Sequence, residues 1–173
     1  MHGLRLMNWA GRISDDRRDE SLLLVDVLGL ETLVDDLTLG NASATATSIL
    51  GPMWRANAPI RDNGSPIGFD LPPDAETVFM HGTVTDAESG EPLVDAEVDV
   101  WQALTNAHIH LKINAKGHKP LVTQIFDVEC PYLEQDVAFA VKEELKVRFV
   151  PREGDERAKL ELGYDIRLAG EDV

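Results

Sequence analysis

The C-terminal two thirds of the sequence alternates short runs of β-forming residues with turn residues, and this spacing is the strongest constraint on the fold. Residues 77–85 and 96–103 are rich in β-branched and aromatic side chains, and the connection 86–95 carries Gly90 and Pro92, so the pattern predicts a hairpin. Further strands are predicted at 108–114, 121–126, 145–150 and 159–168. Short strands at such regular spacing predict a mainly β fold, a β-sandwich.

One segment nearer the N-terminus has helical periodicity. Apolar residues between Leu22 and Leu37 recur at intervals of three and four, which predicts an amphipathic helix over 19–37, or two helices broken near Gly29. This is the only strong helical signal in the sequence. Residues 38–73 are dominated by small and turn-forming residues and are predicted to form an ordered loop. We therefore expect an N-terminal helical segment at 1–45 and a β-sandwich domain at 46–173.

The charge balance restricts the partners of the chain. Its 16 Lys and Arg residues against 31 Asp and Glu residues give a formal net charge of -15, which repels nucleic-acid phosphates and anionic lipid surfaces alike. No nucleic acid or membrane is therefore expected as a partner. The first residues lack the continuous apolar region of a secretory signal, and the single cysteine, Cys130, excludes an internal disulfide framework. We expect a cytoplasmic protein.

The most chemically specific pattern is His108-Ile109-His110, which falls in a predicted strand. A strand turns successive side chains to opposite faces, so both imidazoles should point to one side while Ile109 and Leu111 point to the other. Two nitrogens that converge in this way can bind a borderline or transition metal, and carboxylate, phenolate or water must complete the coordination sphere. The alternative is a structural one, in which one histidine is a core residue and the other a surface neighbour.

Two other patterns are architectural in content. The sequence from Gly82 to Val98 reads GxVxDxxxGxPxxxAxV, in which turn residues and alternating small apolar residues indicate a sandwich and no particular reaction. Residues 48–54 (SILGPMW) form an apolar stretch with a Gly-Pro corner, which is either core or the wall of an apolar pocket. Asp26 stands alone among apolar helical residues, and such an acid is more often solvated than bound to a ligand.

Taken together, these patterns resemble the intradiol ring-cleavage dioxygenases, specifically the hydroxyquinol and catechol 1,2-dioxygenase type. The resemblance covers nearly the whole chain. It includes DDRRDE at 15–20, the helical LLLVDVLGLETLVDDL that follows, the Gly-Pro corner, MHGTVTDAESGEP, the AHIH strand and the later TQIF. The resemblance implies an intradiol-dioxygenase-like sandwich with an N-terminal helical segment, incomplete for the reason given below.

The resemblance also implies a function and a site. Family members hold a ferric ion, Fe(3+), with two histidines and two tyrosines, bind a small aromatic diol, and use dioxygen to open the ring between the two hydroxyls. The matching metal ligands are His108 and His110, and Gln124 matches a supporting catalytic glutamine. Positions around the substrate ring match Leu23, Asp26, Ile49, Leu50, Gly51, Pro52 and Met53. The N-terminal helices of the family form a homodimer interface, which implies a possible homodimer here.

The sequence departs from the family pattern between Gln102 and His108. The family carries a long insertion with both tyrosine ligands and a substrate-binding arginine before its AHIH strand, but here Thr105-Asn106 leads directly into Ala107, with Thr105 at the arginine position. The only tyrosines are Tyr132 and Tyr164. We therefore expect impaired ring cleavage, or an inactive truncated product. A non-catalytic binding module is the alternative, and a sandwich that lacks strands should be of marginal stability.

Overall fold

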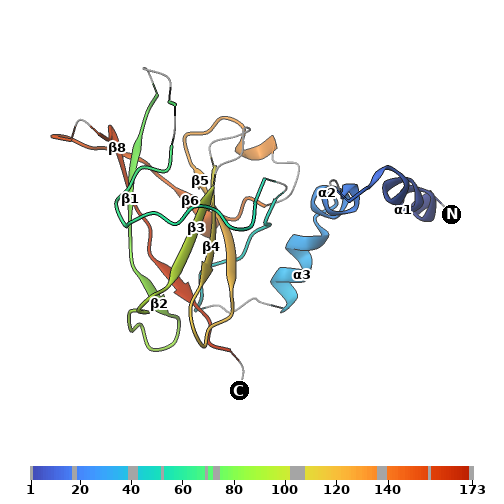
Figure 1. Ribbon diagram of the computed structural model, residues 1–173, viewed down its shortest axis with the longest axis horizontal. Helices are drawn as coiled ribbons and strands as arrows, with labels where there is room; N and C mark the ends of the chain where they lie inside the picture. Colours follow the sequence, from blue (N-terminus) through green and yellow to red (C-terminus); the bar gives the residue numbers. More distant parts are fainter. Residues whose placement is uncertain are drawn as a thin grey trace.

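The structure is a computed structural model that describes residues 2–16, 19–38, 43–51, 53–68, 70–71, 75–101, 108–135, 140–155 and 157–171 (Figure 1). The helices are α1 (His2–Ile13), α2 (Glu20–Val27) and α3 (Leu30–Thr38), with short 3-10 helices η1 (Leu133–Gln135) and η2 (Glu143–Leu145). The strands are β1 (Val78–His81), β2 (Val84–Asp86), β3 (Glu97–Trp101), β4 (His108–Asn114), β5 (Leu121–Asp127), β6 (Lys146–Val147), β7 (Val150–Pro151), β8 (Leu160–Gly163) and β9 (Ile166–Leu168).

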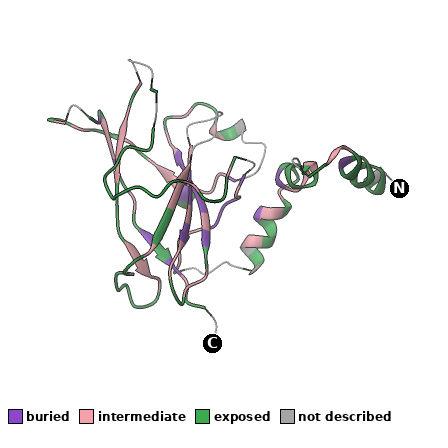
Figure 2. Ribbon diagram, in the orientation of Figure 1, coloured by how far each residue is buried: buried purple, intermediate pink, exposed green. Residues whose placement is uncertain are grey.

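The strands form two packed layers. One layer is the sheet β3-β4-β5-β6, and the other consists of β1-β8-β7 followed by β2-β9. Buried residues of both layers meet in one apolar core. From the first layer these are Leu111, Ile113, Leu121 and Ile125, and from the second Leu162, Ile166 and Leu168. The buried parts of the ribbon lie mainly on the strands of the sandwich (Figure 2). Burial of facing apolar side chains between two sheets is what holds a sandwich together, so the predicted mainly β sandwich is confirmed.

The predicted hairpin between 77–85 and 96–103 is wrong. β2 pairs in parallel with β9, and β3 pairs with β4 in the other layer. The turn itself does form, because Asp86 Oδ1 accepts hydrogen bonds from Ser89 N and Oγ, and one bridge joins Thr85 to Pro92. Beyond that bridge the chain crosses to the opposite layer. Turn residues therefore marked the bend correctly but did not determine the strand partner.

Gly82 divides the long predicted strand 77–85 into β1 and β2. A Cβ atom placed on Gly82 would lie 1.9 Å from the carbonyl oxygen of Tyr164, so no other residue fits without a backbone shift. The break is matched on the neighbouring ribbon, where β8 and β9 replace the single strand predicted at 159–168. The strand predicted at 145–150 is likewise divided into β6 and β7, whereas the predictions for β4 and β5 are confirmed.

The helical segment lies to one side of the sandwich, with α3 nearest to the sheets and α1 farthest away (Figure 1). The predicted break is confirmed, since α2 ends at Val27, α3 begins at Leu30, and Gly29 between them has φ +65°. The side chain of Asp19 caps α2 by accepting a hydrogen bond from Ser21 N. Helix α1 was not predicted from the sequence, although its apolar residues do recur on one face of the helix.

Candidate functional site

The two histidines of β4 lie together on one face of the four-stranded sheet. Their Nε2 atoms are 3.0 Å apart, and the ring centroids are 4.7 Å apart. His110 is only 3% exposed and stacks on Trp101 at a centroid distance of 5.0 Å, whereas the ring of His108 lies against Phe126. The predicted convergence of two imidazole nitrogens is therefore what the structure shows.

Strand register explains the residues around this pair. His110 lies opposite Trp101 of β3 on one side and opposite Gln124 of β5 on the other. Residues directly opposite on neighbouring strands point to the same face, so Trp101, His110 and Gln124 form a row across the sheet. Ile109 and Leu111 point to the other face, where they pack in the core, as the alternation predicted. The sheet thus separates the histidine pair from the sandwich interior.

Residues 48–51, which we call the wall segment, cover this face of the sheet. Ser48 N donates to Val122 O and the Gln124 side chain donates from Nε2 to Ile49 O, both at 2.9 Å. Gly51 then turns with φ +72°, and a Cβ there would lie 3.0 Å from His110 Cε1. The wall segment is therefore pressed against the histidine pair at a point where only glycine fits comfortably.

Beyond the wall segment the chain is fixed again at Trp54. Its indole Nε1 donates a 2.8 Å hydrogen bond to Asp99 Oδ2, and the Lys112 ammonium lies 4.3 Å from the ring centroid, a cation–π distance. Asp99 and Lys112 are paired residues of β3 and β4. No pattern in the sequence indicates this contact, because a lone Trp in a loop does not show which strands it meets.

Burial lowers the pKa of His110. Desolvation, with a smaller contribution from the charge of His108, lowers the pKa of His110 to about 4. At neutral pH His110 is therefore uncharged, the form in which an imidazole nitrogen can act as a metal ligand. The 3.0 Å contact between the Nε2 atoms needs one nitrogen as donor and the other as acceptor.

A carboxyl pair lies where α2 meets α3. Asp26 is 3% exposed, and neither of its oxygens has a hydrogen-bond donor among the described groups if both acids are ionised. Burial, and then the neighbouring Glu31, raise the pKa of Asp26 to about 7. Glu31 Oε1 in turn accepts a 3.1 Å hydrogen bond from Leu50 N in the wall segment. Asp26 is thus a buried acid rather than a solvated one, and it reaches the wall through Glu31.

The histidine pair fits two neighbouring positions around a metal ion. Nitrogens bound about 2.0–2.1 Å from one ion at roughly 90° to each other would be about 3 Å apart, which agrees with the observed 3.0 Å. The described part of the chain, however, holds no group of three or more His, Cys, Asp or Glu side chains that could bind a metal. The donors therefore fit half of a coordination sphere.

Tyr132 and Tyr164 are the two tyrosines of the sequence and thus the candidates for a phenolate ligand. Tyr164 packs against the core between the layers, on the opposite side of β4 from the pair, and burial raises its pKa to about 12. Tyr132 precedes η1 and is 54% exposed. Thr105, at the position where the family arginine would stand, lies outside the described residues. On this placement Tyr164 supplies no phenolate to the face of β4 that carries His108 and His110.

The residues predicted to surround a substrate ring lie in different environments. Ile49, Leu50 and Gly51 are in the wall segment, although Ile49 also packs in a small core with Phe126, Ala140 and Leu145. Asp26 connects to that segment through Glu31. Leu23 and Met53 are 45% and 51% exposed, and Pro52 lies outside the described residues. Sequence reasoning did not find Glu31, because its contact joins two segments that are not adjacent in the chain.

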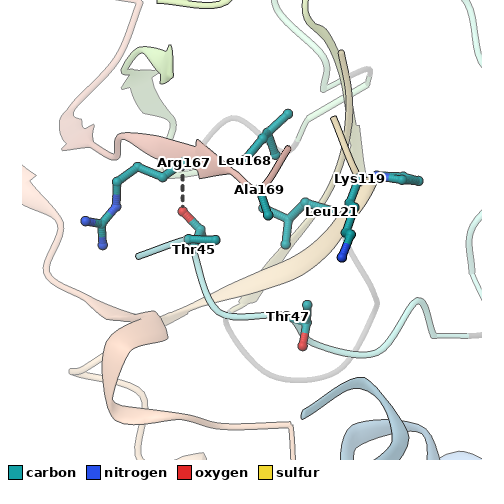
Figure 3. Close-up of a pocket in the computed structure, with 9 residues that line it drawn as sticks. Thr45, Thr47, Lys119, Leu121, Arg167, Leu168 and Ala169 are labelled. Carbon is teal, nitrogen blue, oxygen red and sulfur yellow. Dashed lines mark hydrogen bonds between the residues drawn. The ribbon is translucent and has the colours of Figure 1, made fainter. Parts of the chain in front are cut away.

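A separate small cavity lies between residues 44–47, which precede the wall segment, the start of β5 and the end of β9 (Figure 3). Thr45, Thr47, Lys119 and Leu121 line it, and Thr45 Oγ1 accepts a 2.8 Å hydrogen bond from Arg167 N. The Arg167 side chain points away from Thr47 and Leu121 (Figure 3). None of the predicted site residues lines this cavity, so it is distinct from the histidine site.

Comparison with known proteins decides the family. Residues 1–46 match the family model described as catechol dioxygenase N terminus, and residues 103–170 match the model described as dioxygenase. An intradiol ring-cleavage dioxygenase of Aspergillus niger, prcA, is 30% identical, with 98% of this chain and 74% of that protein aligned. The chain belongs to the intradiol ring-cleavage dioxygenases. A catechol 1,2-dioxygenase of Candida albicans is 29% identical over 98% of this chain and 78% of that protein.

The intradiol dioxygenase fold is equally clear in solved structures. Hydroxyquinol 1,2-dioxygenase from Pseudomonas putida matches with a TM-score of 0.83 at 24% identity, covering 98% of this chain and 82% of that one. Catechol 1,2-dioxygenase from Pseudomonas arvilla matches with a TM-score of 0.70 at 26% identity, covering 99% and 77%. The alignment with the Aspergillus protein runs over 233 positions, whereas this chain has 173 residues, so the relative carries sequence with no counterpart here.

Proposed function

We propose that this chain is an aromatic-diol-binding member of the intradiol dioxygenases whose ring-cleavage activity is strongly impaired. The observation that carries the proposal is the pair formed by the half-buried His108 and the buried His110, with Nε2 atoms 3.0 Å apart under the wall segment. Relatives that align over most of the chain are named catechol and hydroxyquinol 1,2-dioxygenases, and the proposed substrates are diols of these two types together with dioxygen.

We assign the proposed site residues the following roles. His108 and His110 would hold the iron, and bound ferric iron would supply chelation of the diol and activation of its ring. Gln124 positions the wall segment through Ile49 O rather than by facing solvent, since it is almost completely buried. Leu50 and Gly51 would border the diol ring next to His110. Leu23, Asp26, Pro52 and Met53 remain proposed ring neighbours on the helical and loop sides.

The impairment follows from the donors that are missing. Ferric iron prefers hard anionic oxygen ligands, and the histidine pair supplies imidazole nitrogens instead. Loss of partners that merely support a metal ligand typically costs about 10–100-fold in affinity or activity. Loss of direct ligands should cost more, and the family arginine, which would stabilise negative charge on the diol, has no basic counterpart at Thr105.

We also propose that the chain consists of two parts, a helical segment at 1–45 and a sandwich domain at 46–173, and that the helical segment mediates homodimer formation. Apolar side chains of α1, α2 and α3 are exposed on the single chain, and contact with a second copy would bury them. These include Leu4, Met7, Trp9, Leu28, Leu33 and Leu37. No helix in the described part of the chain is long and apolar enough to cross a membrane. With one cysteine and no disulfide, we propose a cytoplasmic location.

The proposal is tested by measuring diol binding and turnover separately. Chain loaded with ferric iron is titrated with hydroxyquinol or catechol under nitrogen by calorimetry, and oxygen uptake is then recorded in air. We expect saturable diol binding that is lost in His108→Ala and His110→Ala, with oxygen uptake close to background. The exposed His81, which pairs with Glu161 in the other layer, provides the control variant His81→Ala. Binding that is equal in all four proteins would contradict the proposal.

A further inference from the structure

The wall segment is held from both sides, and one of its supports comes from outside the sandwich. On the sheet side, Gln124 binds Ile49 O and Val122 O binds Ser48 N. On the helix side, Glu31 of α3 accepts the hydrogen bond of Leu50 N at 3.1 Å. Leu50 is the residue before Gly51, which abuts the ring of His110. A shift of the Leu50 backbone would therefore move the surface that faces the histidine pair.

A carboxylate is a strong acceptor for such a backbone N–H, but this one has a second acid beside it. Asp26 is almost fully buried next to Glu31, and its two oxygens have no donor if both acids are ionised. A single proton between the two carboxyl groups resolves this conflict, because like charges at close range repel and a protonated acid can donate to its ionised neighbour. The raised pKa of Asp26 agrees with this arrangement. Of the charged groups on the adjoining helices, which include Arg12 and Asp35, Glu31 is the one that contributes to the shift.

We propose that Glu31 is a positioning residue for the site: it holds the wall segment against His110 through Leu50 N, and the Asp26 carboxyl donates its proton to Glu31 and fixes the orientation of that side chain. The α2–α3 turn thus controls the placement of the wall. Glu31 itself contacts neither histidine, so it acts through Leu50 and Gly51. This inference concerns the same site as the proposed function, but its principal test needs no diol or metal.

The test is amide hydrogen exchange at Leu50, measured by NMR on the whole chain. Glu31→Leu removes the acceptor and should lower the protection of the Leu50 amide about tenfold or more, because the hydrogen bond that closes it is lost. Glu31→Gln keeps an oxygen acceptor and should restore most of the protection. Glu153→Leu, at an exposed acid in another loop, is the matched control and should leave Leu50 unchanged. The amides of Leu111 and Ile125 in the core report global unfolding in the same spectra.

Two outcomes would overturn the proposal. One is unchanged Leu50 protection in Glu31→Leu, and the other is an equal loss in the Leu and Gln variants. If Glu31→Leu unfolds the whole chain, two variants of Asp26 test the proposal instead. Asp26→Asn can still donate a hydrogen bond to Glu31 and should preserve the protection of the Leu50 amide, whereas Asp26→Leu should lower it. Equal protection of the Leu50 amide in both variants refutes the proposal. Hydroxyquinol titration of the iron-loaded variants is read separately. Absence of diol binding in the wild-type chain would refute the proposed function and leave the exchange result standing.

Discussion

Replacement of Gly51 by alanine should damage this protein through two separable effects. The first is backbone strain, because Gly51 has φ +72° and a residue with a Cβ pays about 1–2 kcal/mol in this region. The second is steric, because the new Cβ would lie 3.0 Å from Cε1 of His110. That ring cannot move freely, since it is buried and stacked on Trp101, and forcing extra volume into a packed site costs about 1–3 kcal/mol.

The combined cost is about 3 kcal/mol, which corresponds to a fall in Tm of roughly 6–12 °C for a chain of this size. Gly117→Ala is the matched control, because Gly117 has φ +77° but open space where a Cβ would be placed. It carries the strain alone, about 1–2 kcal/mol, and should lower Tm by roughly 2–8 °C. Differential scanning calorimetry on the two variants and the wild type gives both values.

Binding separates the two variants further. Gly51→Ala should also weaken hydroxyquinol binding to the iron-loaded chain, because the displaced ring belongs to a proposed metal ligand, whereas Gly117→Ala should leave binding at the wild-type level. Equal Tm losses in the two variants, with equal binding, would show that the wall segment does not press on His110 and would refute the geometry on which the site is based.

Three further predictions follow from buried and paired groups. Burial and then Glu31 raise the pKa of Asp26 to about 7, so the chain should lose stability between about pH 4, where the unfolded carboxyl ionises, and about pH 7, where the folded one does. Asp26→Asn should raise stability at pH 8 by on the order of a few kcal/mol and change it little at pH 4, as measured by urea unfolding. An equal effect at both pH values would contradict a shared proton. A second prediction concerns His118, whose Nε2 lies 2.9 Å from Asp86 Oδ2. The hydrogen bond with the Lys116 carbonyl, and then the contact with Asp86, raise the pKa of His118. Hydrogen bonds from Ser89, and then the contact with His118, lower the pKa of Asp86. The pair should therefore stabilise the fold most between about pH 4 and 6.5, and His118→Gln should lower Tm more at pH 6 than at pH 9; a pH-independent loss would count against it. Sedimentation should show a dimer that dissociates in Leu33→Glu of α3, whereas Glu144→Gln in η2 should leave it intact.

Local patterns predicted the parts of this structure that depend on neighbours in the sequence. Strand alternation was enough to place His108 and His110 on one face, because it fixes side-chain direction without knowledge of the partner strand. The helix break at Gly29 was readable for the same reason. The hairpin prediction failed because Asp86–Ser89 forms a good local turn whichever sheet receives the next strand.

The candidate site depends on contacts that no local pattern encodes. The wall segment was recognised as apolar, but its place over His110 is set by Gln124 and Glu31, which lie in different elements. Asp26 was interpreted by default as a solvated helical acid, and only the packing of α2 shows that it is buried. Sequence thus identified the chemical groups, while the distances that make them a site came from tertiary structure.

The most direct test of the central claim is the visible absorption spectrum of the chain loaded with ferric iron under nitrogen, before and after addition of hydroxyquinol. A phenolate ligand on ferric iron gives a broad visible charge-transfer band. We predict no such band before the diol is added, because Tyr164 packs on the other face of β4 and the side chain of Tyr132 is exposed to solvent. After the diol binds we predict a new band, which should be absent in His110→Ala. A broad band before the diol is added would contradict the account, since it would mean that a tyrosine completes the metal site.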